Sequence, residues 1–213
     1  RAADEYRDRL KQYRASPSTP PDRDSKGWHI DITFVANPNK YSILRGIEIP
    51  EFGGDTLWTN LVAAYEGLSA SIKTLIDGLQ AVHVATVYDF IGTKPSAPKT
   101  LRSVHPLVRV HPETGEKALF LNPGVITHIL GLKGTESAAI LNLLFEEITR
   151  PEYQVRFRWT PNAIAFWDNQ ATAHAGPIDY AHFNLPRVVR RITVAGELPT
   201  GPDGFQSYPL EGD

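Results

Sequence analysis

The chain has 213 residues, no cysteine, no methionine and a formal net charge of −2. This length suits a single domain with a sizeable core. The lack of cysteine excludes a disulfide scaffold, a thiolate metal site and a cysteine nucleophile, and balanced charge argues against a nucleic-acid partner. No apolar stretch has the length of a membrane span and no signal-peptide pattern opens the chain, so we expect a cytoplasmic protein without a membrane partner.

Short strand-like segments dominate the chain. In chain order, the pattern predicts a loop at 15–27, strands at 28–34 and 41–49, a helix over 60–79, a strand at 80–88, a flexible basic loop at 91–102, strands at 105–110 and 118–121, a helix over 135–149, and strands at 153–159, 163–167 and 188–195. Many short strands with helical insertions predict a mainly β fold, either a β-sandwich or a jelly roll with added helices.

His29 and Asp31 lie two residues apart on the expected strand 28–34. Side chains at positions i and i+2 of a strand point to the same face, so the two can converge. A distant histidine, such as His174 at the end of a strand and a polar turn, would complete a set of two histidines and one carboxylate. That set leaves coordination positions open and suits an oxygen-activating Fe(II). His-x-Asp occurs often by chance, so the pair alone favours a histidine that is hydrogen-bonded to a nearby carboxylate.

Arg187 and Arg191 share one face of the last expected strand. Two guanidiniums on an inward face require anionic partners, because a buried unpaired charge is costly. A solvent-facing strand with ordinary surface arginines explains the same spacing equally well. The residues alone therefore leave both interpretations open.

Four motifs in order, WHID, GGDTLWTN, FWDNQATAH and RVVRRITVAGE, resemble the taurine dioxygenase/TfdA family of Fe(II)- and 2-oxoglutarate-dependent dioxygenases. The similarity runs over residues 21–197 and includes ALFLNPG and EYQVRFRW between the motifs. The resemblance implies a double-stranded β-helix core, which is jelly-roll and cupin-like. It also implies Fe(II) as the cofactor, with 2-oxoglutarate and O2 as cosubstrates.

The resemblance assigns roles to individual residues. His29, Asp31 and His174 would hold the iron. Thr56 and Arg187 would bind the remote carboxylate of 2-oxoglutarate, a contact that suits a planar guanidinium. The remaining assignments concern the primary substrate, and they fall on Arg191, Ile32, Phe90 and Val125.

One departure from the family pattern affects the arginines. Arg187 and Arg191 lie thirteen and seventeen residues after His174, two residues further than is usual in the family. We interpret the difference as a two-residue insertion near 181–185. Arg190 then competes with Arg191, but strand alternation favours Arg187 and Arg191 on one face and Arg190 on the other.

The resemblance implies hydroxylation of a small anionic substrate with release of succinate and CO2. A sulfonate such as taurine comes first, then an alkyl sulfate ester, whose hydroxylation beside the ester oxygen releases sulfate and an aldehyde, and then an aryloxyalkanoate or other carboxylate. A carboxylate at position 31 argues against halogenation. A zinc hydrolase on the same triad has no use for Thr56 and Arg187, and the intact triad argues against a binding module without catalysis.

The chain as a whole, residues 1–213, is expected to be one dioxygenase domain. Its length and its lack of methionine match the core of a longer family, so we expect an N-terminal portion and part of a lid loop near 91–102 to be absent. By family analogy we expect a homo-oligomer, a dimer or a tetramer. His83 and His105 on expected strands are interpreted as hydrogen-bonded core residues, whereas His111 at a turn is expected to be exposed.

Overall fold

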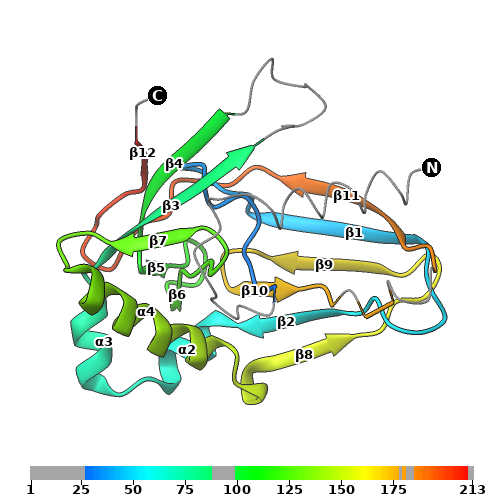
Figure 1. Cartoon of the computed structure of the whole chain (residues 1–213), viewed down its shortest axis with the longest axis horizontal. Helices are drawn as coiled ribbons and strands as arrows, with labels where there is room; N and C mark the ends of the chain where they lie inside the picture. The colour runs from blue at the N-terminus through cyan, green and yellow to red at the C-terminus, as the bar shows by residue number, and fades with distance from the viewer. Residues whose placement is uncertain (1–26, 88–98, 178, 181–184, 211–213) are drawn as a thin grey trace.

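The computed structural model describes residues 27–87, 99–177, 179–180 and 185–210, and it shows a mainly β fold with its helices gathered at one end (Figure 1). The elements in chain order are β1 Tyr41–Glu48, β2 Thr56–Asn60, α2 Leu61–Gly67, α3 Ala70–Ile76, β3 Gln80–Val87, β4 Lys99–Pro106, β5 Val108–Val110, β6 Lys117–Leu119, β7 Ile126–Ile129, α4 Gly134–Ile148, the 3-10 helix η1 Pro151–Tyr153, β8 Gln154–Phe157, β9 Ile164–Asp168, β10 Thr172–Ala175, β11 Val188–Val194 and β12 Tyr208–Pro209. In this part of the chain, no helix is long and apolar enough to cross a membrane.

The strands pair antiparallel in sheets of order β11–β1–β9, β10–β2–β8, β12–β4–β3–β7 and β5–β6. The inner faces of the first two sheets meet at Trp167 of β9 and Trp58 of β2, whose ring centroids are 5.4 Å apart. The mainly β class predicted from the sequence is confirmed. These two facing sheets carry His174, Thr56 and Arg191, whereas His29 and Asp31 lie outside the named strands.

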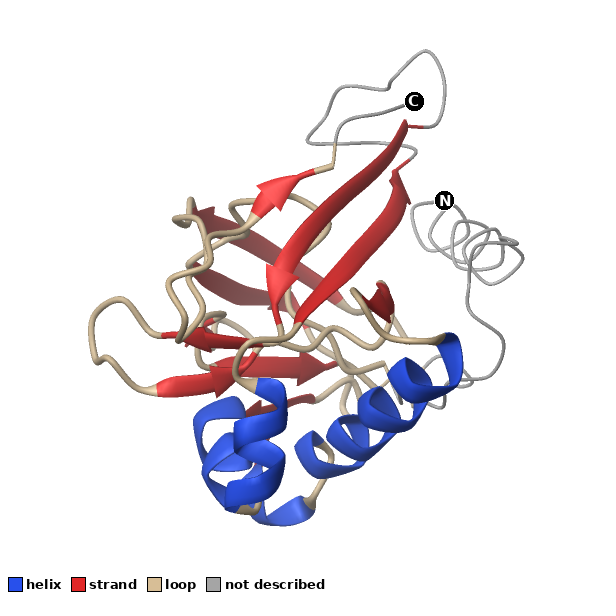
Figure 2. Ribbon diagram, turned by 90° about the vertical axis from the view of Figure 1, so that its left-hand side faces the viewer, coloured by secondary structure: helices blue, strands red, loops and turns tan. Residues whose placement is uncertain are grey.

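The helices lie side by side at one end of the strands (Figure 2). α2 packs on β6 and α4 packs on β7, and the apolar residues between these elements are fully buried. The sequence predicted one helix over 60–79, but the structure has two, because each half has its own N-cap. Asn60 accepts hydrogen bonds from Val62 and Ala63, and Ser69 accepts one from Ile72 after an extended Leu68.

The strand predicted at 28–34 is wrong beyond its start. Only His29 forms a β-bridge, and residues 31–34 form a turn in which Ile32 has φ +47°. The β-branched residues Ile30, Ile32 and Thr33 favour a strand locally, but tertiary contacts override this preference. The turn determines where Asp31 lies.

Other boundaries also differ from the prediction. Residues 99–102, expected in a loop, begin strand β4, whereas 88–98 lie outside the described residues. The sequence did not predict β7 and β12, and it placed His174 at the end of a turn rather than within β10. These strands are short, with little alternation to reveal them.

Candidate metal centre and anion-binding residues

The structure brings His29, Asp31 and His174 together, with one ligand atom of each within 4.8 Å of the others. A pair of backbone hydrogen bonds, both 2.8 Å, joins His29 and His174 in opposite directions. This bridge sets the two rings side by side, with centroids 4.1 Å apart. Asp31 and His174 are buried, at 4% and 8% exposed. His29 and Asp31, which precede β1, thus form one compact group with His174 of β10.

Both imidazoles are suited to metal binding. Nδ1 of His29 lies 2.9 Å from the carbonyl oxygen of Gly27, which can only accept, so Nδ1 donates and Nε2 is the nitrogen left to coordinate a metal ion. Burial, together with neighbouring His29, lowers the pKa of His174 to about 3, so this ring is neutral at neutral pH. Neutral imidazole is the form that coordinates a metal ion.

The Asp31 carboxylate is held at both oxygens. The Ser42 hydroxyl donates to Oδ2 at 2.7 Å, and the Arg191 guanidinium donates to Oδ1 at 3.0 Å. Burial raises the pKa of Asp31, but His174, Arg191 and the Ser42 hydroxyl together hold it below its usual value. The carboxylate is therefore ionised at neutral pH and supplies a negative charge.

These three side chains fit an octahedral ion such as Fe(II). Two neutral imidazoles and one carboxylate form the donor set of non-haem Fe(II) oxygenases, which leaves coordination positions open. Asp31 Oδ1 and His174 Nε2 are 3.8 Å apart, too far for a hydrogen bond. The ligand atoms of the carboxylate and the ring are therefore close without being paired to each other.

Ser42 and Asn169 extend the support of Asp31 into the sheet. The Asn169 side-chain amide donates to the Ser42 hydroxyl, and the Trp167 indole donates to Asn169, both at 2.9 Å. Ser42 is not among the residues predicted from the sequence. The sequence feature that could have indicated it is a polar residue at an inward position of strand β1, where the alternating pattern predicts an apolar one.

Thr56 and Arg187 lie on neighbouring segments. Trp159 donates its indole N–H to the Thr56 hydroxyl at 2.9 Å, so the hydroxyl retains its own proton for donation. Nε of Arg187 donates to the carbonyl oxygen of Gly54 at 2.7 Å, two residues before Thr56. This contact orients the guanidinium, whose terminal nitrogens carry further donors.

The glycines of the GGDT segment permit this approach. Gly53 and Gly54 have φ of +71° and +70°, a left-handed conformation that glycine adopts without strain. A Cβ on Gly54 would lie 2.8 Å from Cδ of Arg187. The Gly54 N–H also donates to Asp179 at 2.8 Å, which ties the segment to the chain that leads to Arg187.

Strand register relates Thr56 to the metal centre. His174 of β10 lies opposite Trp58 of β2, and Thr56 is two residues before Trp58 on the same strand face. Diagonal neighbours of this kind are roughly 7–8 Å apart at their Cα atoms. Thr56 is thus on the same face as His174 and close to it.

Among the remaining predicted residues, Arg191 contacts Asp31, and Ile32 follows Asp31 in the chain. Arg191 shares the inner face of its sheet with Ser42, whereas Arg190 lies opposite Arg45 on the outer face. Ile32 is half-buried in the turn after Asp31, and half-buried Val125 accepts a backbone hydrogen bond from Val84. Phe90 lies outside the described residues.

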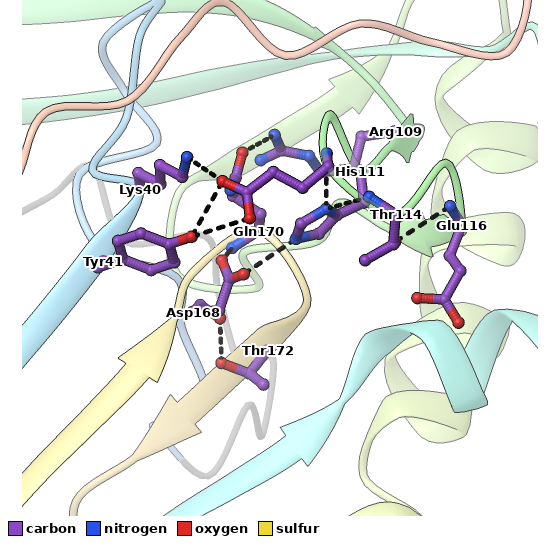
Figure 3. A network of polar contacts seen from close by, with 10 residues as sticks. Lys40, Tyr41, Arg109, His111, Thr114, Glu116, Asp168, Gln170 and Thr172 are labelled. Atoms are coloured by element: carbon purple, nitrogen blue, oxygen red, sulfur yellow. Dashed lines mark hydrogen bonds and ion pairs between the residues drawn. The ribbon is translucent and has the colours of Figure 1, made fainter.

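The predictions for the histidines outside the triad are confirmed at two positions and wrong at one. His83 and His105 are fully buried and hydrogen-bonded, which confirms their interpretation as core residues. The expectation that His111 is exposed is wrong, since it is 5% exposed and contacts Asp168 at 2.9 Å. Figure 3 shows that this contact belongs to a polar network that also includes Arg109 and Gln170. The network fixes the turn between β9 and β10.

Comparison with known proteins agrees with this geometry. Residues 2–193 match the family model described as taurine catabolism dioxygenase TauD, TfdA family. An alkylsulfatase of Acinetobacter baylyi is 42% identical, covering 85% of this chain and 60% of the relative, and an alpha-ketoglutarate-dependent sulfate ester dioxygenase of Pseudomonas putida is 41% identical, covering 84% and 63%. A crystal structure of a taurine dioxygenase from Burkholderia xenovorans has a TM-score of 0.81 and 47% identity, covering 91% of this chain and 65% of that chain.

The chain thus spans a little over three fifths of the length of these two curated relatives. The family model, in contrast, matches most of the chain, including all three candidate ligands, Thr56 and Arg187. On this match the chain belongs to the TauD/TfdA family of dioxygenases.

Proposed function

We propose that this chain is an Fe(II)- and 2-oxoglutarate-dependent dioxygenase that oxidises a small alkyl sulfate ester. The observation that carries the proposal is the buried group of His29, Asp31 and His174, whose ligand atoms lie within 4.8 Å of one another. Family membership adds the double-stranded β-helix core. When bound, Fe(II) with 2-oxoglutarate would reduce O2 and oxidise a substrate C–H bond, with release of succinate and CO2.

The chain's own residues would bind and orient the reactants. His29 and His174 would each offer a ring nitrogen, and Asp31 would supply the anionic ligand. Arg187 and Thr56 would bind the remote carboxylate of 2-oxoglutarate, the arginine through its terminal nitrogens and the threonine through its hydroxyl proton. Gly54 keeps the arginine in place by accepting from its Nε.

Arg191 would bind the anionic group of the primary substrate. Its guanidinium has five N–H donors, and its side chain is 51% exposed although it also contacts Asp31. A sulfate or sulfonate placed on the open side of this guanidinium would lie beside the metal centre. Binding there would bring a neighbouring carbon of the substrate toward the oxidant. Ile32 and Val125 are proposed to contact the same substrate.

Two relatives support the sulfate ester over a sulfonate, although the family resemblance puts a sulfonate first. The alkylsulfatase and the sulfate ester dioxygenase are 42% and 41% identical to this chain. Hydroxylation of the carbon next to the ester oxygen gives an unstable hemiacetal-type product, which separates into an aldehyde and sulfate. The taurine dioxygenase structure, 47% identical, keeps a sulfonate as the second candidate.

A substrate panel with two readouts tests the proposal. The protein is incubated with Fe(II), 2-oxoglutarate and O2 and with alkyl sulfates, sulfonates or aryloxyalkanoates, and succinate, sulfate and sulfite are measured. We expect alkyl sulfates to give succinate and sulfate in equal amounts, and only with both Fe(II) and O2. Sulfite with a sulfonate would favour the second candidate. Sulfate release with Zn(II) and no 2-oxoglutarate would overturn the proposal in favour of a hydrolase.

Three expectations from the sequence remain predictions. They are a homo-oligomeric state, a cytoplasmic location and a single dioxygenase domain over residues 1–213. Analytical ultracentrifugation of the purified chain tests the first, because a dimer or tetramer differs from the 23.7 kDa monomer in sedimentation.

A further inference from the structure

The turn that carries Asp31 has a backbone conformation that its own sequence disfavours. Ile32 has φ +47°, in the left-handed region that a β-branched residue rarely adopts. Within the turn, the backbone N–H of Val35 donates a hydrogen bond of 3.1 Å to the carbonyl oxygen of Ile32. Such a conformation persists only where the surrounding structure imposes it. Contacts from other elements must therefore hold Asp31 where it lies.

Asn122 bridges the two sides of this turn. Its side-chain nitrogen donates to the backbone oxygen of Ile30 at 2.7 Å and to the hydroxyl of Thr33 at 2.8 Å. Because Ile30 and Thr33 flank Asp31 and Ile32, one amide fixes the width of the turn. Asn122 is 3% exposed, so the bonds form in a buried environment where their loss is costly.

Two buried histidines hold Thr33 from the other side. Nδ1 of His83 lies 2.9 Å from the Thr33 hydroxyl, and Nε2 of His105 donates to the Thr33 carbonyl oxygen at 2.7 Å. A carbonyl can only accept, so His105 is protonated at Nε2 and accepts at Nδ1, where the Ser207 hydroxyl lies at 2.7 Å. Thr33 is thus fixed at both its hydroxyl and its carbonyl.

These contacts come from one face of the β3–β4 pair. His83 lies opposite Ser103, and His105 is two residues further along β4, so the three side chains share a face. The Ser103 hydroxyl donates to the backbone oxygen of Phe34 at 3.0 Å and closes the far end of the turn. One sheet face therefore supports the second half of the turn, Thr33 and Phe34.

We propose that Asn122, His83 and His105 are positioning residues that, through Thr33 and the turn backbone, set the orientation of Asp31 in the metal centre. The inference rests on the proposed role of Asp31 as a metal ligand. Residues that orient a ligand from outside the coordination shell typically change metal affinity 10- to 100-fold when they are replaced. Here the support acts on the turn, whereas Ser42 and Arg191 act on the carboxylate.

The test measures Co(II) affinity by competition with a chelating indicator, and folding by urea unfolding, in the full chain. The variants are Asn122→Ala, Thr33→Val and Thr33→Ser. We expect the first two to bind Co(II) roughly 10- to 100-fold more weakly. Thr33→Ser keeps the hydroxyl and is expected to restore affinity to within a few-fold of the unchanged protein.

Thr59→Val is the matched control. Thr59 is fully buried, and its hydroxyl donates to the backbone oxygen of Ile148 at 2.6 Å. It neighbours Trp58 on β2, so its side chain points to the face opposite His174. We expect this variant to lose stability but to keep its Co(II) affinity.

The outcomes separate the inference from the proposed function. Unchanged Co(II) affinity in folded Asn122→Ala or Thr33→Val overturns the inference, as does an equal loss in Thr59→Val. If Asn122→Ala does not fold, the pair Thr33→Val and Thr33→Ser decides alone. If the unchanged protein does not bind Co(II), or if His174→Ala binds it as tightly as the unchanged protein, then the metal centre itself is contradicted. Both the proposed function and this inference then fail.

Discussion

Asp31 is oriented by residues that no local sequence pattern connects to it. The His-x-Asp spacing made it a candidate ligand, but the predicted geometry, two side chains on one strand face, is wrong. The chain turns after His29, and this turn brings the carboxylate to Ser42, eleven residues later, at 2.7 Å. The sequence pattern predicted Asp31 as a candidate ligand, but only tertiary contacts reveal the residues that hold it.

Replacing Ser42 with alanine should weaken metal binding. The substitution leaves Oδ2 of Asp31 without its hydroxyl donor, so the carboxylate is less firmly held, and we expect a roughly 10- to 100-fold loss of Co(II) affinity. Ser137→Ala is the control. Ser137 of α4 is also buried, but its hydroxyl accepts a hydrogen bond from the backbone N–H of Ile129 at the end of β7. Equal affinities in Ser42→Ala and the unchanged protein would argue against this role.

Replacing Arg187 and replacing Arg191 should raise the KM of different reactants. Arg187→Ala removes a charge-assisted contact and should raise KM for 2-oxoglutarate roughly 10- to 100-fold. Arg191→Ala should raise KM for the primary substrate instead. Because Arg191 also contacts Asp31, both variants are measured at saturating Fe(II). The reverse pattern would mean that the two assignments are exchanged.

At the scale of elements, alternation predicted strands well but not which face is covered. In the sheet β11–β1–β9 the inner face carries the polar Ser42 and Arg191, whereas Ile164, Phe166 and Ile192 on the outer face are more than 60% exposed. The usual pattern is apolar inside. The inner face also holds buried Trp167, so the pattern is broken rather than reversed. The break lies beside the candidate metal centre, and periodicity alone does not predict it.

Gly54 links the β2 segment to Arg187, so its replacement by alanine should affect both stability and cosubstrate binding. The left-handed φ of +70° costs an alanine roughly 1–2 kcal/mol, and the added Cβ would contact Cδ of Arg187 at 2.8 Å. We expect a lower urea midpoint together with a raised KM for 2-oxoglutarate.

Gly78→Ala is the control for this substitution, since a Cβ there meets no atom within 4 Å and its φ is not left-handed. A Gly54→Ala protein with unchanged KM for 2-oxoglutarate would show that Arg187 does not depend on this close approach.

At the scale of the whole molecule, the buried histidines make stability depend on pH. Burial lowers the pKa of His105 to about 4, against 6.5 for an unperturbed histidine. Between these values the unfolded chain binds more protons than the folded one, so stability rises with pH and falls on acidification. From pH 7 to pH 5 this residue alone should cost on the order of 2 kcal/mol.

Urea unfolding of the metal-free protein at both pH values checks this prediction. A His105→Asn variant is expected to be less stable overall but to lose less stability between pH 7 and pH 5. The same loss in the variant and in the unchanged protein would contradict the prediction.

The candidate ligands could be predicted from the sequence, whereas the residues that support them could not. Motif order identified His29, Asp31, His174, Thr56 and Arg187 as candidates, because each lies in a segment with a family resemblance. The supports of these residues, such as Ser42, Asn122 and His105, come from other elements and have no distinctive spacing. They become recognisable only when the strands are placed in register.

The most direct test of the central claim, that this chain is a 2-oxoglutarate-dependent dioxygenase, is to follow the atoms of O2. The reaction is run with isotopically labelled oxygen gas, Fe(II), 2-oxoglutarate and an alkyl sulfate, and succinate is analysed by mass spectrometry. We predict one labelled oxygen atom in each succinate molecule, since oxidative decarboxylation transfers one atom of O2 to the new carboxylate. Product formation without label in succinate, or with Zn(II) in place of Fe(II), would contradict the claim.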